Sequence, residues 1–323
     1  MSKILVVGGA GYIGSHMVRL ALDQGHAVSV LDNLCGGFRD AVDARANFIL
    51  GDIGNRELML DLLARQYDGV MHFASYIQVG ESMANPAKYY RNNLVNSMNI
   101  LDAMVAAPNT KFIFSSSAAV YGNPQYSPID ERHPLAPINP YGRTKLMFEQ
   151  ALSDYDHAYG LKSVALRYFN AAGAAPDSSL GERHDPETHL IPLVLQAALG
   201  QREGIDIYGD DYDTPDGTCI RDYVHVMDLC DAHLAALEWL LDGGESMALN
   251  LGSTTGNSVR EVIDVATRVT GRGICVRNAP RRLGDPAILV ADAGMARKKL
   301  NWMPNVTNIE QIVFDAWRWH ARL

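Results

Sequence analysis

Short apolar runs alternate with longer segments of helical period along the first half of the chain. The apolar runs lie at 4–7, 27–31, 47–53, 69–75, 111–122 and 163–170. Between them, the segments at 56–66, 87–107 and 140–159 carry apolar residues at the spacing of amphipathic helices. Strands that alternate with helices of this length are typical of parallel βαβ units. The pattern therefore predicts an α/β fold with a doubly wound parallel sheet of the Rossmann type.

The sequence pattern changes at about residue 171, where glycines, prolines and charged residues replace the periodic apolar positions. A chain of 323 residues also exceeds the size at which single cores usually stop growing. We predict a nucleotide-binding Rossmann domain over 1–170 and a smaller C-terminal substrate-binding domain over 171–221 and 251–323. The segment 222–250 is expected to return to the first domain.

The stretch Gly8–Gly14, GGAGYIG, lies between the first predicted strand and a helix. Backbone N–H groups at a helix N-terminus favour a pyrophosphate, and glycines let it approach the backbone closely. Asp32 ends the next strand about twenty residues later, as in dinucleotide-binding folds, and can accept both ribose hydroxyls. Because Asn33 offers no positive charge to a 2′-phosphate, the pattern predicts NAD in preference to NADP.

Composition narrows the class of protein. The net charge of −9 argues against nucleic acid or an anionic membrane as the main partner. No apolar run is long enough to span a bilayer, and the first strand begins too early for a signal peptide. The four cysteines, Cys35, Cys219, Cys230 and Cys275, are scattered without a C-x-x-C pair. These features predict a cytoplasmic enzyme with reduced thiols.

Tyr141 and Lys145 lie four residues apart at the start of a predicted helix, so their side chains share one face. An ammonium beside a phenol lowers its pKa from about 10 towards neutrality and makes it a usable base. Ser117 ends the preceding strand and can bond the same substrate oxygen. The spacing predicts Tyr141, Lys145 and Ser117 as catalytic residues.

The motifs GGAGYIGSH, SSSAAVYG, NPYGRTK, RYFNAAG and DGTCIRDYVHVMDL, spread over 8–229, resemble the extended short-chain dehydrogenase/reductase family, and within it the sugar-nucleotide 4-epimerases. The resemblance implies 4-epimerisation of UDP-galactose and UDP-glucose with NAD that stays bound. Tyr141 would remove the O4 proton while hydride passes from C4 to the nicotinamide, assisted by Ser117. Lys145 would bind the nicotinamide ribose, and hydride would return to the other face of a 4-keto sugar.

The resemblance also implies individual contacts. The cofactor would contact Gly8, Gly11, Tyr12, Ile13, Gly14, Asp32, Asn33, Leu34, Cys35, Gly36, Gly37, Asp52, Ile53, Phe73, Ala74, Ser75, Asn92, Ser115, Tyr141, Lys145 and Phe169. The UDP-sugar would contact Ser117, Tyr141, Asn170, His189, Leu190, Tyr208, Arg221, Arg282, Asp285 and Leu289. Arg221 and Arg282 suit a diphosphate, since a guanidinium donates two parallel hydrogen bonds. Asp285 suits ribose hydroxyls, and Tyr208 suits stacking on uracil.

Three positions separate this chain from its sister enzymes. Ala118 and Ala119 stand where 4,6-dehydratases carry an Asp-Glu pair, which argues against dehydration. Ile77 stands where many such epimerases have a cofactor-binding Lys. Leu289 stands where a bulky aromatic blocks N-acetylated sugars in some members, so we expect at least partial acceptance of UDP-N-acetylglucosamine. An epimerase of another UDP-sugar, N-acetylated or uronate, and a non-catalytic NAD-sensing protein stay open as alternatives.

The sequence also gives expectations about metal binding and about the oligomeric state. His184 and His189 are separated by Pro186, and no third ligand is evident in the sequence, so we predict no metal. The segments 87–107 and 140–159 carry apolar residues on more than one helical face, and family members pair through such helices. The residues concerned include Leu94, Met98, Leu101, Met147 and Leu152, and they predict a homodimer.

Overall fold

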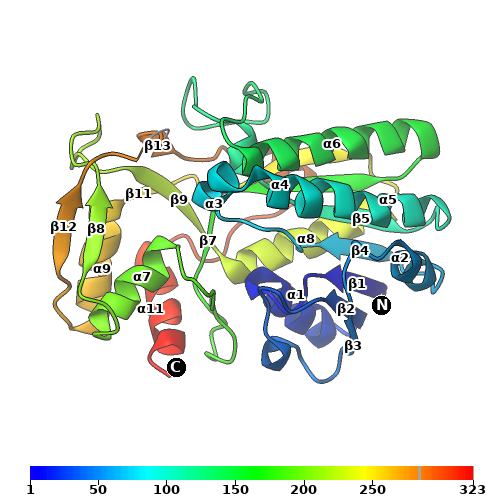
Figure 1. The fold of residues 1–323 in the computed structure, drawn as a ribbon, viewed down its shortest axis with the longest axis horizontal. Coiled ribbons are helices and arrows are strands. Elements are labelled where there is room, and N and C mark those ends of the chain that lie inside the picture. Colours follow the sequence, from blue (N-terminus) through cyan, green and yellow to red (C-terminus); the bar gives the residue numbers. More distant parts are fainter. Residues whose placement is uncertain (283–284, 323) are drawn as a thin grey trace.

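A seven-stranded parallel sheet forms the larger part of the molecule (Figure 1). The computed structural model describes residues 1–282 and 285–322. The sheet has the order β10-β6-β5-β4-β1-β2-β3. Its strands are β1 (Lys3–Val7), β2 (Ala27–Asp32), β3 (Asn47–Leu50), β4 (Gly69–His72), β5 (Lys111–Ser117), β6 (Ser163–Tyr168) and β10 (Met247–Leu251). The predicted doubly wound α/β fold is confirmed.

Helices cover both faces of this sheet because its strands are apolar on both sides. Ile4 and Val6 of β1 face one hydrophobic core, whereas Leu5 and Val7 face the other. The first core is closed by α1 (Tyr12–Asp23), α8 (Val226–Leu241) and α10 (Gly294–Leu300). The second is closed by α2 (Arg56–Leu63), α5 (Ser97–Val105) and α6 (Pro140–Tyr159). α5 and α6 lie on the opposite side of the sheet from α1 in Figure 1.

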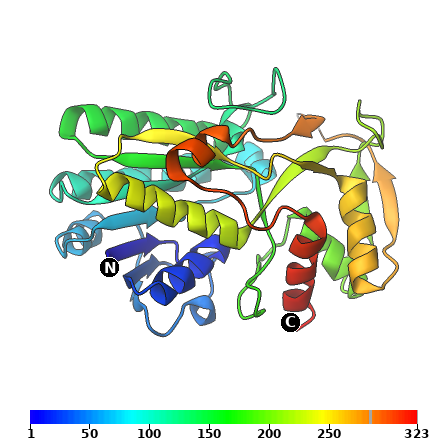
Figure 2. The ribbon, with the colours of Figure 1, turned by 180° about the vertical axis from the view of Figure 1, so that it is seen from behind.

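A second group of strands and helices lies beside the end of the main sheet (Figure 2). A four-stranded sheet contains β7 (Asn170–Ala172), β9 (Ile220–His225), β11 (Gly256–Ser258) and β13 (Ile288–Leu289). β8 (Ile205–Tyr208) and β12 (Val276–Ala279) form a parallel pair. The helices of this part are α7 (Leu190–Ala198), α9 (Val259–Thr270) and α11 (Ile309–His320). Its separate hydrophobic core contains residues of β7, β8, β9, α7, α9 and α11. None of the helices in the described residues combines the length and apolarity that crossing a bilayer requires.

The structure differs from the sequence pattern at three elements near the site. The strand expected over 111–122 ends at Ser117, where the hydroxyl accepts a hydrogen bond from Ala119 N and begins a 3₁₀ helix, η3 (Ala118–Val120). The helix expected over 87–107 is divided into α4 (Pro86–Tyr89), a π-helical turn η2 (Tyr90–Asn96) and α5. A short helix, α3 (Val79–Ala84), precedes it, and a 3₁₀ turn, η1 (Arg39–Ala41), follows β2.

The third difference concerns the segment that we expected to return to the main sheet. Helix α8 packs on that sheet and β10 is its edge strand, but β9 pairs with β7, β11 and β13 of the smaller sheet. The run 220–225, IRDYVH, mixes apolar and charged residues, so its own pattern does not assign it to either sheet. Its partners were therefore decided by tertiary packing and not by its own pattern.

Candidate active site

The glycine turn after β1 leaves no room for side chains. Gly8 has φ of +85°, and a Cβ added there would lie 2.5 Å from the backbone N of Ala74. A Cβ at Gly14 would lie 2.1 Å from Gly8 O. Gly11 caps α1 without a side-chain hydrogen bond, so the first N–H groups of the helix are free of local competitors. This arrangement fits the pyrophosphate of a dinucleotide.

Asp32 ends β2 with both carboxylate oxygens fixed by the backbone. Oδ2 accepts a hydrogen bond from Ala10 N at 2.9 Å, and Oδ1 accepts one from Leu34 N at 2.8 Å. The side-chain amide of Asn33 donates to Asp52 Oδ2 at 2.5 Å, which joins the ends of β2 and β3. Asp32 is buried, so its carboxylate is oriented before any ligand arrives. A fixed acceptor at this strand end fits a ribose diol.

Lys145 is buried at the carboxyl ends of β4 and β5. Its Nζ donates hydrogen bonds to Ser115 O at 2.7 Å and to Ser75 Oγ at 2.8 Å. Burial lowers the pKa of Lys145 to about 7, and the nearby Glu149 opposes that shift. The lysine is thus held in one position by the strand end and by the loop after β4. Ser115 contributes its carbonyl oxygen, while its hydroxyl lies 3.2 Å from His233 Nε2.

Tyr141 is positioned by the first turn of α6. Asn139 caps the helix by accepting a hydrogen bond from Gly142 N at 2.8 Å. A Cβ at Gly142 would lie 2.4 Å from Ala119 O, so only glycine allows the helix to approach η3 this closely. The contact brings the phenol of Tyr141 beside the hydroxyl of Ser117. A strand end and a helix start therefore meet at the three predicted catalytic residues.

The electrostatics of Tyr141 differ from the expectation. Burial raises its pKa above 10, and only the Ser117 hydroxyl opposes that shift. The Lys145 ammonium lies 5.8 Å from the centre of the tyrosine ring and is directed at Ser115 and Ser75. The expected lowering of the Tyr141 pKa by Lys145 is not found in this arrangement, where burial is the larger effect and raises that pKa.

Of the predicted nucleotide-sugar residues, Arg221 and Leu289 lie on β9 and β13, whereas Tyr208 ends β8 and His189 and Leu190 begin α7. The Arg221 guanidinium donates to Asp285 Oδ1 at 2.5 Å, so these two side chains pair with each other. The Arg282 guanidinium lies 3.9 Å from the centre of the Tyr208 ring and occupies the face that we assigned to uracil. A ligand that uses Arg221, Asp285 or Tyr208 must displace or share these contacts.

Leu289 lies near the predicted catalytic residue Ser117 although it is far along the chain. It is paired with Arg221 in the register of β13 and β9. Together with Phe169, it packs on the hydrophobic cluster that contains Ala118 and Val120 of η3. The position expected to control the size of the sugar is therefore adjacent to the element that carries Ser117. The side chain of Asn170, another predicted substrate residue, is held by a hydrogen bond that its amide donates to Asp222 O at 2.9 Å.

Some predicted cofactor side chains face elsewhere. The Tyr12 hydroxyl donates to Gly173 O at 2.7 Å, and burial raises the pKa of that phenol well above its usual value. Only the backbone of Tyr12 is directed at the glycine turn. The Phe73 ring packs 4.7 Å from the His233 ring, centre to centre. The side chain of Ile77 is 37% exposed and replaces the expected lysine without a polar group.

Sequence reasoning missed Asn93. Its buried side chain bonds Tyr76 twice, because Oδ1 accepts from Tyr76 N and Nδ2 donates to Tyr76 O, each at 2.9 Å. Asn92, a predicted cofactor residue, donates to Asn93 Oδ1 at 3.0 Å. The π-helical turn presents both amides to the loop after β4, which also carries Ser75. The signal in the sequence was a pair of asparagines in the middle of an otherwise helical segment.

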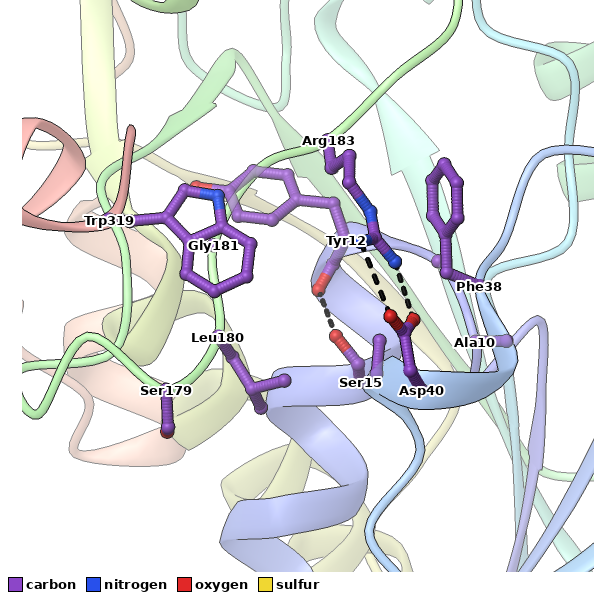
Figure 3. Close-up of a pocket in the computed structure, with 12 residues that line it drawn as sticks. Ala10, Tyr12, Ser15, Phe38, Asp40, Ser179, Leu180, Gly181, Arg183 and Trp319 are labelled. Atoms are coloured by element: carbon purple, nitrogen blue, oxygen red, sulfur yellow. Dashed lines mark hydrogen bonds and ion pairs between the residues drawn. The ribbon is translucent and has the colours of Figure 1, made fainter. Parts of the chain in front are cut away.

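A cavity of about 180 Å³ lies between the start of α1 and the second part of the molecule (Figure 3). Gly11, Tyr12, Gly181 and Trp319 are among its lining residues. Arg183 closes one side, since its guanidinium pairs with Asp40 at 2.5 Å. The same guanidinium lies 3.6 Å from the centre of the Phe38 ring. The loop after β7 is thereby linked to the loop after β2.

Comparisons with known proteins agree with this geometry. Residues 4–252 match the NAD dependent epimerase/dehydratase family. A UDP-glucose 4-epimerase of Lacticaseibacillus casei is 50% identical over 318 residues, which cover 98% of this chain and 96% of that protein. The crystal structure of UDP-glucose 4-epimerase from Brucella ovis in complex with NAD is 48% identical, with a TM-score of 0.95 and 98% of each chain covered. A UDP-Glc/GlcNAc 4-epimerase from Campylobacter jejuni is 45% identical, with a TM-score of 0.88 and 100% of each chain covered.

Proposed function

Because this chain belongs to the NAD dependent epimerase/dehydratase family, we propose that Tyr141, Ser117 and Lys145 carry out the 4-epimerisation of UDP-galactose and UDP-glucose. The chain is an NAD-dependent isomerase acting on a UDP-hexose. The observation that best supports these roles is the meeting of the Tyr141 phenol and the Ser117 hydroxyl at a strand end where Lys145 is rigidly held.

The residues fit NAD along the carboxyl edge of the sheet. The turn Gly8–Gly14 suits the pyrophosphate, and the fixed carboxylate of Asp32 suits the adenosine ribose. Lys145 lies where it can bind the nicotinamide ribose, as its Nζ already donates to groups at the ends of β4 and β5. When bound, NAD supplies the hydride acceptor and donor, together with a positive charge that favours a phenolate at Tyr141.

The chain's own residues handle the proton. Tyr141 accepts the proton of the sugar O4 hydroxyl and later returns it, while the Ser117 hydroxyl stabilises the phenolate by donating a hydrogen bond. Tyr141 is half-buried, which limits the access of water to the phenol during the proton transfer. Ala118 and Ala119 provide no carboxylate, so neither can serve as the base that removes the C5 proton in dehydration.

The direct test uses the purified full chain with UDP-galactose and no added NAD. We expect UDP-glucose to accumulate until the two sugars reach equilibrium, because bound NAD is regenerated in each cycle. Failure of turnover in protein that contains stoichiometric NAD would favour the NAD-sensing alternative. Turnover of another UDP-sugar in its place, such as a uronate, would change the substrate but not the roles of Tyr141 and Lys145.

A second substrate class, UDP-N-acetylhexose, is favoured by Leu289. Its side chain packs with Phe169 on the cluster that follows Ser117, and leucine takes less space there than an aromatic ring. A relative that shares 45% of this sequence is named a UDP-Glc/GlcNAc 4-epimerase. We expect this chain to convert UDP-N-acetylglucosamine as well, and kcat/KM for the two sugars measures the preference. No turnover of the N-acetylated sugar, with UDP-galactose converted, would remove this candidate.

Helices α5 and α6 are the proposed dimer interface. Met147 of α6 is 40% exposed and Val105 of α5 is 40% exposed, whereas Leu101 and Leu152 are buried in the protein core. The exposed apolar side chains are those available to a second copy. Sedimentation of the full chain is expected to give twice the mass of one chain. All four cysteines are free, which supports a reducing compartment such as the cytoplasm.

A further inference from the structure

Four side chains of the loop between β7 and α7 converge on one point. Glu182, His184, Glu187 and His189 each offer one ligand atom, and these atoms all lie within 4.8 Å of one another. Nδ1 of His189 lies 2.7 Å from Glu182 Oε1 and 3.3 Å from Glu187 Oε1. Nδ1 of His184 lies 3.2 Å from Glu182 Oε1 and 3.5 Å from Glu187 Oε2.

These separations are those of ligands around one ion. Nitrogen and oxygen ligands that bind tetrahedral zinc at ~2.0–2.1 Å lie ~3.3–3.5 Å from one another. Three of the four nitrogen–oxygen distances in the cluster fall between 3.2 and 3.5 Å, with His184 facing Oε2 and His189 facing Oε1 of Glu187. The fourth, at 2.7 Å, requires only a small rotation of a side chain to open. All four ligand atoms lie within 4.8 Å of one another, so the cluster would contract slightly around an ion.

Hydrogen bonding within the cluster is incomplete. The Nδ1 atoms of His184 and His189 are buried, and neither N–H direction meets an acceptor, although carboxylate oxygens are close. The side chains of Glu182 and Glu187 are each 5% exposed. Within residues 1–282 and 285–322, their only ion-pair contacts are with these two histidines. A cation at the centre of the cluster would compensate the two buried carboxylates and would occupy the Nδ1 atoms of both imidazoles.

We propose that Glu182, His184, Glu187 and His189 form a binding site for a divalent transition metal ion, with Zn²⁺ the ion expected first. Imidazole nitrogen and carboxylate oxygen are ligands that zinc accepts, and two carboxylates with two neutral imidazoles balance its charge. Because the protein supplies four ligands, the ion has a structural role and does not activate water. The sequence analysis expected no metal because it found no third ligand, and Glu182 and Glu187 are the further candidate ligands that the sequence pattern did not reveal.

The position of the cluster suggests what the metal holds together. The His184 ring meets the Tyr12 ring edge-on at 6.3 Å, and Tyr12 begins α1 at the glycine turn. The backbone oxygen of Glu182 accepts a hydrogen bond from Trp319 Nε1 of α11 at 3.1 Å. His189 is the N-cap residue of α7. A metal here fastens the loop against α1, α7 and α11, beside the cavity that Figure 3 shows.

A metal-free ion-pair cluster is the competing arrangement. Although burial favours the neutral ring, the two carboxylates raise the pKa of His189 to about 10 and that of His184 to about 9. Two protonated histidines would also neutralise Glu182 and Glu187. The two arrangements therefore differ in metal content and in the effect of chelators, and not in net charge.

The test measures metal in the full-length protein. After dialysis against metal-free buffer, elemental analysis is expected to find one Zn²⁺ per chain, or one after addition of Zn²⁺ and gel filtration. Replacement by Co²⁺ is expected to give the visible absorption of a tetrahedral site. His184→Asn and Glu187→Gln should each weaken the binding of Co²⁺ by at least about 10-fold. Asp40→Asn, which alters a carboxylate bonded to the same loop, should leave it unchanged.

Two results would overturn the proposal. If the wild-type chain binds neither Zn²⁺ nor Co²⁺ in stoichiometric amount, the cluster is an ion-pair network only. If both variants fold, as circular dichroism reports, and bind Co²⁺ as tightly as the wild type, the ion lies elsewhere. Since metal content is measured without substrate, neither result bears on the proposed epimerisation. In support, the thermal midpoint of the wild type should fall on chelation and recover with Zn²⁺, whereas that of Glu187→Gln should not respond.

Discussion

The edge of the main sheet and the loop over 178–189 build their polar sites in opposite ways. At the sheet edge, Ser117 ends a strand and Tyr141 lies in the first turn of a helix, so regular elements fix both side chains. In the loop, Glu182 and His189 meet on a backbone with no regular structure between β7 and α7. The comparison shows that site residues on strands and helices can be predicted from local sequence patterns. Site residues on irregular backbone cannot, because no periodic pattern predicts their positions.

Histidines show the same contrast in electrostatic terms. Burial lowers the pKa of His72 to about 3, with the Lys145 charge acting in the same direction, and burial lowers the pKa of His233 to about 4. In the loop, the carboxylates overcome burial and raise the pKa of His189 to about 10. Burial alone therefore does not decide whether a histidine carries charge, because its neighbours do.

The largest expected effect tests the sheet edge. Tyr141→Phe removes the proton-transferring hydroxyl, so kcat is expected to fall by about 10²–10⁴-fold while NAD stays bound. Tyr159→Phe is the matched control, because that tyrosine ends the same helix and is 57% exposed. The conversion of UDP-galactose and the NAD content of both variants are the measurements. Near-normal turnover by Tyr141→Phe would transfer the catalytic role to another residue.

Asp32→Asn tests the cofactor end of the same edge. An amide cannot accept from Ala10 N and Leu34 N together, and it loses the charge that favours ribose hydroxyls. We expect NAD to bind about 10–100-fold more weakly, which corresponds to ~1.5–3 kcal/mol for a hydrogen bond to a charged group. NAD retained after gel filtration measures the effect. Asp68→Asn is the control, since Asp68 also accepts from the backbone, but at Lys3 on the opposite edge.

The pH dependence of the free energy of unfolding tests the buried histidine His72 at the end of β4. The folded pKa of His72, about 3, lies below the ordinary value of 6.5 for the unfolded chain. Its contribution is therefore present above pH 6.5 and is lost as the pH falls from 6.5 towards 3, because only the unfolded chain takes up the proton. The free energy of unfolding should lose up to about 1.4 kcal/mol per pH unit in this window from this one group.

The measurement compares denaturant unfolding of the wild type, His72→Gln and the exposed His157→Gln at several pH values. His72→Gln is expected to flatten the dependence below pH 6.5, whereas His157→Gln should follow the wild type. Parallel curves for all three proteins would mean that His72 takes up its proton in the folded state.

The smallest effect tests Leu289 of β13, which packs beside the sheet edge from the smaller sheet. Leu289→Tyr adds volume beside Phe169, so kcat/KM for UDP-N-acetylglucosamine should fall by about 10-fold relative to UDP-galactose. Leu289→Met keeps the volume and is expected to keep the ratio. An equal loss for both sugars would show that the tyrosine disturbs the cluster with Val120 and Ala118 and does not select against the N-acetyl group.

Much of the sheet edge was predictable from local pattern. Buried strands that end in Asp32 or Ser117, the glycine turn and the four-residue spacing of Tyr141 and Lys145 are all properties of short segments. The prediction was wrong about the pKa of Tyr141, since desolvation depends on everything packed around the ring. It also missed Asn93, whose partner is a backbone seventeen residues away.

The sequence by itself determined the parallel sheet, the dinucleotide turn and the elements that carry the catalytic side chains, because strand and helix periods and glycine turns depend on neighbouring residues. Only the tertiary structure decided that β9 joins the smaller sheet, that Leu289 packs on the cluster that follows Ser117, and that Arg221 pairs with Asp285. It also decided that Glu182 and Glu187 face two histidines. Such contacts depend on distances between segments that no local periodicity encodes.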